Sequence, residues 1–260
     1  MSSNFLQGLS AMLGVLLQLG VALLLASLFL GRGRRGRRGG EGQEEGAGLW
    51  GLVWLMQAVA VGTLVMRFVL LPNLDLTHLQ EGSALVRALY TVYALAKVAF
   101  FAFIAAAAVR LRRPAREADL LRGLWMLAAV QACVAVAAAG DLTRTVQWNA
   151  PFGATCQLVA AAMVWRTRGT QARFGRGLAT AALVLMATVS ISQVEVFREA
   201  PRSELDRMTG LRYWLHQGYT VHYNSEIDMV LQLLLGGGIL RLLGTPASRP
   251  SASRPVPSES

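Results

Sequence analysis

The sequence has little charge for its length, and Lys97 is its only lysine. Asp, Glu, Lys and Arg make up 15% of the 260 residues, whereas a soluble domain usually carries about 25%. Charge is missing mainly from long apolar runs, so 54% of the chain is hydrophobic and the mean hydropathy is +0.43. This composition excludes an ordinary soluble domain and predicts a membrane protein.

Cysteine is scarce, and the common catalytic motifs are missing. The two cysteines, Cys133 and Cys156, both lie in apolar runs, which excludes a disulfide framework and a cysteine-rich metal site. The chain has no nucleophile elbow, P-loop, dinucleotide fingerprint or HExxH motif. Residues 236–238 are three glycines inside an apolar run, and they predict close helix packing or a kink. These observations identify no cofactor and leave open whether the chain is an enzyme.

Seven apolar runs have the character of membrane helices, which need about 20 mostly apolar residues to cross the hydrocarbon core. They are residues 5–30, 49–71, 84–109, 120–139, 152–165, 178–194 and 227–243. The fifth run is short and is expected to extend backwards through residues 145–148. We therefore predict an all-α, polytopic bundle of about seven transmembrane helices over residues 1–243, followed by a disordered Pro- and Ser-rich tail over residues 244–260.

Arginines follow the first, third, fifth and seventh runs and are scarcer in the second and fourth connections. They are Arg32, Arg34, Arg35, Arg37, Arg38, Arg110, Arg112, Arg113, Arg116, Arg166, Arg168, Arg173, Arg176, Arg241, Arg249 and Arg254. Basic residues accumulate in cytoplasmic loops. The pattern therefore predicts that the N-terminus is outside and the C-terminus is in the cytoplasm.

The connections account for the remaining charge. Residues 31–48 are predicted to form a flexible Arg- and Gly-rich cytoplasmic loop. Residues 197–224 form the longest external loop, where helical spacing of apolar residues after a capping signal predicts a short interfacial helix. Since the net charge of +10 comes from arginines flanking the runs, no nucleic-acid partner is expected. The preference for arginine over lysine favours a bacterial, inner-membrane protein.

Lys97 is the most informative single residue, because it stands near the middle of the third run. A charge at that depth costs about 2.5–3.5 kcal/mol, so such residues usually face the bundle interior and pair with an acid or line a wet cavity. Asp228 and Glu195 are the expected acidic partners. Arg67 and Arg87, at the outer ends of the second and third runs, extend this polar zone. The three cations have two interpretations: they bind an anionic ligand, or they neutralise the acids.

Amides and histidines give weaker signals. Five runs each contain a glutamine, and these are expected to form interhelical hydrogen bonds: Gln57, Gln131, Gln157, Gln193 and Gln232.

His222 and Glu226 are four residues apart and share a helix face if the last helix begins early. Together with His216 or His78 they give a candidate metal site of two histidines and a carboxylate. The alternative is that these histidines belong to an ordinary wet loop.

Seven helices with an outer N-terminus resemble, in layout, the membrane input modules of bacterial sensor kinases. The last run lacks the lysine that holds retinal in microbial rhodopsins. The leading hypothesis is a sensor or receptor-like protein that binds a small or amphiphilic ligand in its outer half and signals through a cytoplasmic or membrane partner. The alternatives are a membrane enzyme acting on lipid-like substrates, with the metal site above, and a transporter or assembly subunit. In each case the lipid bilayer is the surrounding partner.

Overall fold

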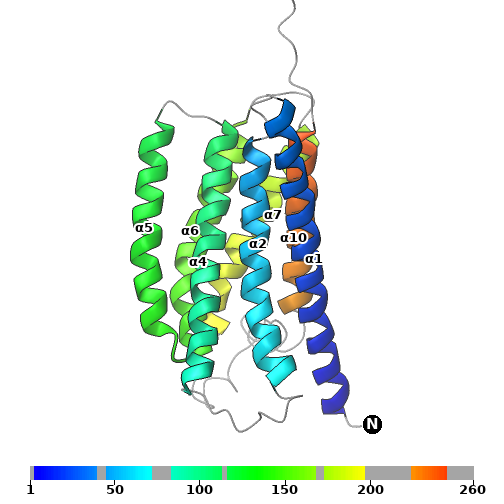
Figure 1. Ribbon diagram of the computed structural model, residues 1–260, viewed down its shortest axis with the longest axis vertical. Coiled ribbons are helices and arrows are strands. Elements are labelled where there is room, and N and C mark those ends of the chain that lie inside the picture. Colours follow the sequence, from blue (N-terminus) through cyan, green and yellow to red (C-terminus); the bar gives the residue numbers. More distant parts are fainter. Residues whose placement is uncertain are drawn as a thin grey trace, which may run out of the picture.

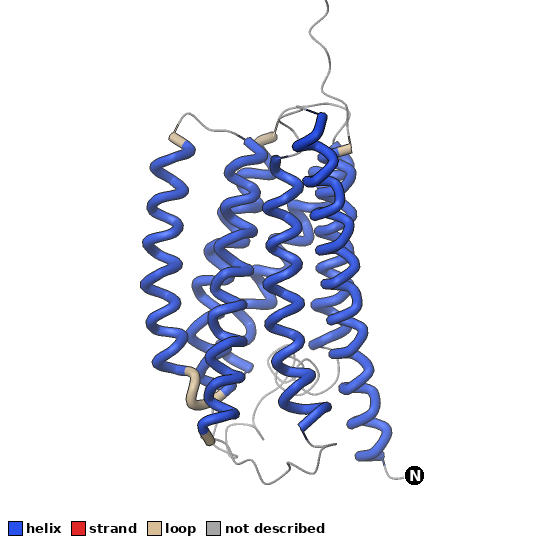
Figure 2. Tube along the Cα trace, viewed as in Figure 1, coloured by secondary structure: helices blue, strands red, loops and turns tan. Residues whose placement is uncertain are grey.

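The computed structural model describes residues 3–39, 45–71, 83–112, 116–167, 173–196 and 224–244, and the regular structure within them is helical (Figures 1 and 2). The helices are α1 (Ser3–Gly39), α2 (Glu45–Val65) continued by the π-helical turn η1 (Met66–Leu70), α4 (Ala84–Arg112), α5 (Glu117–Ala138), α6 (Leu142–Trp165), α7 (Arg173–Val196) and α10 (Asn224–Leu243). Each apolar run of the sequence coincides with one of them, which confirms the all-helical prediction.

Five of these helices are long and apolar enough to cross a membrane, which indicates a multi-pass membrane protein. The candidate spans are Met12–Arg34, Gly46–Leu70, Ala84–Arg112, Glu117–Ala138 and Arg173–Val194. Helices α6 and α10 are outside this set. Both begin with polar residues, since α6 opens on the sequence LTRTVQWN and α10 on NSEID.

Six of the helices form a closed ring. Helix α1 packs against α2, α2 against α4, α4 against α6, α6 against α7 and α7 against α10, and α10 returns to α1. Helix α5 stands outside this ring, where it packs against α4 and, less extensively, against α6 (Figure 1). Successive helices run in opposite directions, so the C-terminal ends of α1, α4, α6 and α10 lie at the same end of the bundle (Figure 1).

Several connections are shorter than the sequence predicts, because helices continue into them. Residues 31–39 belong to α1 and residues 45–48 to α2, so the predicted flexible loop over 31–48 is helical at both ends. Arginine is a good helix former and allows α1 to continue beyond its apolar part.

Helix α6 begins at Leu142, where the side chain of Asp141 accepts a hydrogen bond of 2.9 Å from the backbone N–H of Thr143. This start confirms the expected extension through residues 145–148.

Glycines bring α10 into close contact with its neighbours. A Cβ atom added to Gly238 would lie 2.8 Å from the backbone nitrogen of Ala179 and 2.9 Å from the carbonyl oxygen of Gly175, both in α7. At Gly236 it would lie 2.7 Å from the side chain of Leu25 in α1. Because the atoms that a Cβ at Gly238 would meet belong to the backbone of α7 and cannot move aside, only glycine fits at that position, whereas the Leu25 side chain beside Gly236 could shift. The prediction that this glycine run permits close helix packing is therefore confirmed.

Helix α6 contains Pro151, and a side chain of α5 contacts the backbone just before it. Proline lacks an N–H group and disturbs the helical hydrogen bonds of the preceding turn. Gln131 Nε2 of α5 donates hydrogen bonds to the carbonyl oxygen of Trp148 (2.9 Å) and to Oδ1 of Asn149 (3.1 Å). The amide thus links the outer helix to the ring at its proline-containing turn.

Candidate functional site

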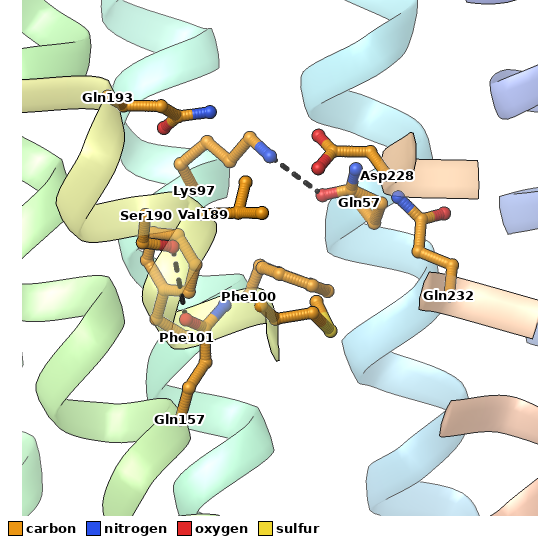
Figure 3. Close-up of a pocket in the computed structure, with 11 residues that line it drawn as sticks. Gln57, Lys97, Phe100, Phe101, Gln157, Val189, Ser190, Gln193, Asp228 and Gln232 are labelled. Carbon is orange, nitrogen blue, oxygen red and sulfur yellow. Dashed lines mark hydrogen bonds between the residues drawn. The ribbon is translucent and has the colours of Figure 1, made fainter. Parts of the chain in front are cut away.

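Lys97 lies on the face of α4 that is directed to the ring interior (Figure 3). Its ammonium group donates a hydrogen bond of 3.1 Å to Oε1 of Gln57 in α2. The same group lies 5.4 Å from the ring centroid of Phe100 and 5.9 Å from that of Phe101, within the range of cation–π attraction. The amide and the two rings therefore hold the lysine inside the bundle, away from either end of the helix.

Asp228, in the first turns of α10, is placed across from Lys97 (Figure 3). The two charges attract each other through space, whereas the hydrogen bond of Lys97 goes to Gln57. The carboxylate receives a hydrogen bond from the side-chain amide of Gln18 in α1. Two acids were expected beside Lys97, and the structure places one of them, Asp228, close enough to interact with the lysine electrostatically.

Two adjacent cavities meet at these charges. One has a volume of about 30 Å³ and the other about 130 Å³, and Lys97, Phe101, Gln193 and Asp228 line both of them. A buried water needs roughly 10–15 Å³ by this measure, so the larger cavity accommodates several waters or one small molecule. Its wall includes an apolar set of described residues, namely Val15, Val61, Leu64, Leu142, Val146 and Ala150.

Two buried amide atoms at the cavities have no hydrogen-bond partner among the residues that the structure describes. They are Nδ2 of Asn149, whose residue is 4% exposed and lines the larger cavity, and Oε1 of Gln232, whose residue is 1% exposed and lines the smaller one. Buried polar groups in proteins are nearly always hydrogen-bonded. By contrast, Gln157 Oε1 accepts a hydrogen bond of 3.0 Å from Ser190 (Figure 3). Asn149 and Gln232 therefore offer one donor and one acceptor to a bound molecule.

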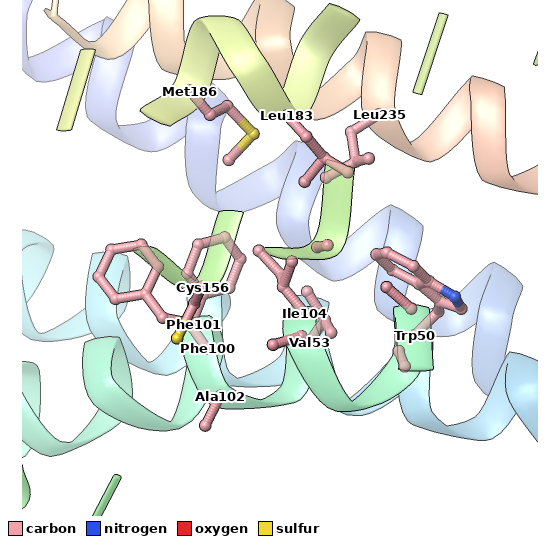
Figure 4. Packing of buried hydrophobic residues seen from close by; sticks show 14 of the residues in the cluster. Trp50, Val53, Phe100, Phe101, Ala102, Ile104, Cys156, Leu183, Met186 and Leu235 are labelled. Atoms are coloured by element: carbon pink, nitrogen blue, oxygen red, sulfur yellow. The ribbon is translucent and has the colours of Figure 1, made fainter. Parts of the chain in front are cut away.

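The cavities occupy one half of the ring, and apolar side chains fill the other half. Residues from the middle of α4 to its C-terminal end pack with the beginning of α2 and with apolar residues of α7 and α10 (Figure 4). Trp50, Ile104, Leu183 and Leu235 are each fully buried in this core. The ring of Phe101 borders both the core and the cavities. The site is therefore closed on the side where α1, α4, α6 and α10 end.

The other predicted ligand-binding residues lie elsewhere. Arg67 is in η1, partly buried, with its guanidinium 5.7 Å from the ring centroid of Phe68. Arg87 is exposed in the first turn of α4, ten positions before Lys97, which is about 15 Å along the helix. Neither arginine lines either cavity. Glu195 is in the last turn of α7, and its side chain is outside the described part of the structure.

The residues of the predicted metal site are mostly outside the described ranges. His78, His216 and His222 all fall there, as does the predicted interfacial helix of the external loop. Glu226 is partly buried in the first turn of α10. Among the residues that the structure does describe, no three His, Cys, Asp or Glu side chains are grouped as metal ligands would be. The metal site remains a prediction.

Sequence reasoning missed several polar residues of the site, among them Ser190 at the smaller cavity. Gln18, Tyr93 and Asn149 line the larger cavity but were not singled out from the apolar runs in which they stand. Gln57 was assigned to interhelical packing and is the direct partner of the lysine. An amide in the middle of an apolar stretch is the signal that marks Gln18, because an amide is costly in a membrane helix unless it faces a polar interior.

The fold and the site together define a helical membrane protein with a polar, partly charged cavity inside a ring of six helices. Comparison with protein-family models, curated proteins and solved structures finds no match to this chain.

Proposed function

We propose that the protein is a receptor-like membrane protein that binds a small ligand in the cavities around Lys97 and Asp228. The observation that carries this proposal is the position of Lys97, which lines both cavities, is bonded to Gln57 and faces Asp228 across the ring. An ion in a membrane helix costs several kcal/mol unless it is compensated, and such residues are retained where they serve a function.

The proposal includes seven spans with the N-terminus outside. Successive helices are antiparallel, and arginines gather where α1, α4, α6 and α10 end, including Arg34, Arg112, Arg166 and Arg241 (Figure 1). By the positive-inside rule this end is cytoplasmic. The cavities lie in the opposite half, which supports a ligand that arrives from outside, and the arginine-rich end is then the surface for a cytoplasmic or membrane partner. A bacterial inner membrane is the location we propose.

Ligand-induced stabilisation tests the proposal, because a ligand that binds the folded state raises its unfolding temperature. The full chain is purified in detergent and screened with a panel of small organic acids, amines, amino acids and sugars. At least one class is expected to stabilise the wild type and to lose this effect in Lys97→Met. Arg122→Met removes an exposed arginine of α5, outside the ring, and is the matched control. No stabilisation by any class contradicts a binding role.

Transport is a second candidate, favoured by two irregularities in the ring. Helix α2 ends in the π-helical turn η1, and α6 contains Pro151. Interrupted helices often line the binding sites of transporters, where irregular backbone is tolerated beside a polar cavity. Uptake into proteoliposomes of a compound that stabilises the protein would favour this reading over a receptor.

A further inference from the structure

We infer that the ligand is a small zwitterion with a carboxylate, a protonated amine and a short aliphatic part, such as a neutral amino acid. This inference rests on the proposed function and names the chemical class that the same cavities would accept. Three independent features of the cavities support it: their charge, their free hydrogen-bonding atoms and their shape.

The charges of the site are balanced. Among the described residues that line the two cavities, Lys97 is the cation and Asp228 the anion, and they come from different helices. A ligand with a net charge would leave one charge uncompensated in a region with little water, which is unfavourable. A zwitterion brings one charge for each side chain. Its carboxylate faces Lys97 and its ammonium faces Asp228.

The free hydrogen-bonding atoms match these charges: the free donors are near Lys97, and the free acceptor is near Asp228. A lysine ammonium has three donors, and one of those of Lys97 is used by Gln57. Asn149 Nδ2 is a further donor in the larger cavity, so a carboxylate there is bound by Lys97 and Asn149. Gln232 Oε1 is an acceptor in the smaller cavity and is one helical turn from Asp228 on the same face of α10. An ammonium there donates to both.

The sizes of the cavities fit this orientation. The smaller cavity, of about 30 Å³, has room for a group of the size of one or two waters, which suits a primary ammonium but excludes a trimethylammonium. The larger cavity, of about 130 Å³, accepts the carboxylate and a short side chain. Val61, Leu64, Leu142 and Val146 line it and favour an aliphatic side chain.

Matched probes test the inference on the purified full chain. Leucine has both charges, 4-methylpentanoate lacks the amine, isopentylamine lacks the carboxylate, and the N-trimethyl derivative of leucine lacks the N–H donors. Leucine is expected to bind at least tenfold more tightly than each of the other three in calorimetric titrations. Lys97→Met, Asp228→Asn and Asn149→Leu are each expected to weaken leucine binding at least tenfold, while Arg122→Met leaves it unchanged.

The outcomes separate this inference from the proposed function. If 4-methylpentanoate or isopentylamine binds as tightly as leucine and the binding depends on Lys97, the zwitterion is wrong and the binding site stands. The same conclusion follows if leucine does not bind but another class of the panel stabilises the protein in a Lys97-dependent way. If leucine binds equally well to the wild type, Lys97→Met and Asp228→Asn, both the inference and the proposed site are wrong. Hydrogen–deuterium exchange verifies that each variant is folded.

Discussion

Lys97 donates its hydrogen bond to Gln57, an uncharged amide, although the carboxylate of Asp228 lies across the same cavity. The amide gives the lysine a fixed position at the α2–α4 contact without neutralising it. The remaining N–H donors of Lys97 therefore stay available to the cavity. Asp228 is in a similar position, because it too accepts its hydrogen bond from an uncharged amide, that of Gln18.

The Lys97–Gln57 hydrogen bond is expected to contribute a measurable coupling energy. Hydrogen bonds between membrane helices average about 0.6 kcal/mol, and hydrogen bonds to charged groups in proteins reach about 1.5–3 kcal/mol. A double-mutant cycle with Lys97→Met and Gln57→Leu is therefore expected to give about 1 kcal/mol, measured by reversible unfolding in mixed detergents. The cycle of Lys97→Met with Ser27→Ala is the control, since the Ser27 hydroxyl donates to the Leu23 carbonyl of its own helix, and it is expected to be additive. An additive Lys97–Gln57 cycle would show that the bond does not stabilise the fold.

Gly238 and Gly237 are adjacent in α10 but are expected to respond oppositely to alanine. At Gly238 the new methyl group would meet the backbone of α7 at 2.8 Å, so α7 and α10 must separate, at a cost of about 1–3 kcal/mol. At Gly237 there is nothing within 4 Å, and alanine is neutral or stabilising by up to about 1 kcal/mol through its helix propensity. Thermal unfolding followed by tryptophan fluorescence distinguishes the two. Equal unfolding temperatures would contradict the close contact of these helices.

Gln131 is expected to hold α5 against the ring. In Gln131→Leu the hydrogen bonds to the Trp148 carbonyl and to Asn149 are lost, and with them about 1 kcal/mol of local stability. Amide hydrogen exchange in α5, and in α6 near Pro151, is then expected to become about fivefold faster, while α7 and α10 are unchanged. Cys133→Ala, at an exposed position of the same helix, is the control. Unchanged exchange in α5 would show that apolar packing alone holds it.

The topology gives a prediction that does not depend on any ligand. Single cysteines are introduced as Ser3→Cys or Ser258→Cys in a chain that also carries Cys133→Ala and Cys156→Ala. A membrane-impermeant maleimide is expected to label position 3 in right-side-out vesicles and position 258 only in inside-out vesicles, because the proposed seven spans would place the two ends on opposite sides of the membrane. Labelling of both positions from the same side would require an even number of spans.

The sequence predicts the helices well, since an apolar run of about 20 residues has few other structures available to it. It predicts their boundaries less well. Helix α6 begins ten residues before its apolar run. Its first turns contain the polar residues Thr145 and Asn149, which are buried in the protein interior, and hydropathy alone does not predict polar residues there. Lys97 and Asp228 could be recognised from the cost of their charge. Their partners could not, because the rotation of each helix about its axis is set by tertiary packing.

The closure of the ring between α1 and α10 has a consequence for the order in which the protein is made. Lys97 is in α4 and Asp228 is in α10, 131 residues further along the chain, so during synthesis the lysine is present long before its opposite charge. Gln57, on the preceding helix, is already in place to accept its hydrogen bond. A nascent chain that stops before α10 has an open ring with an unbalanced cation inside it.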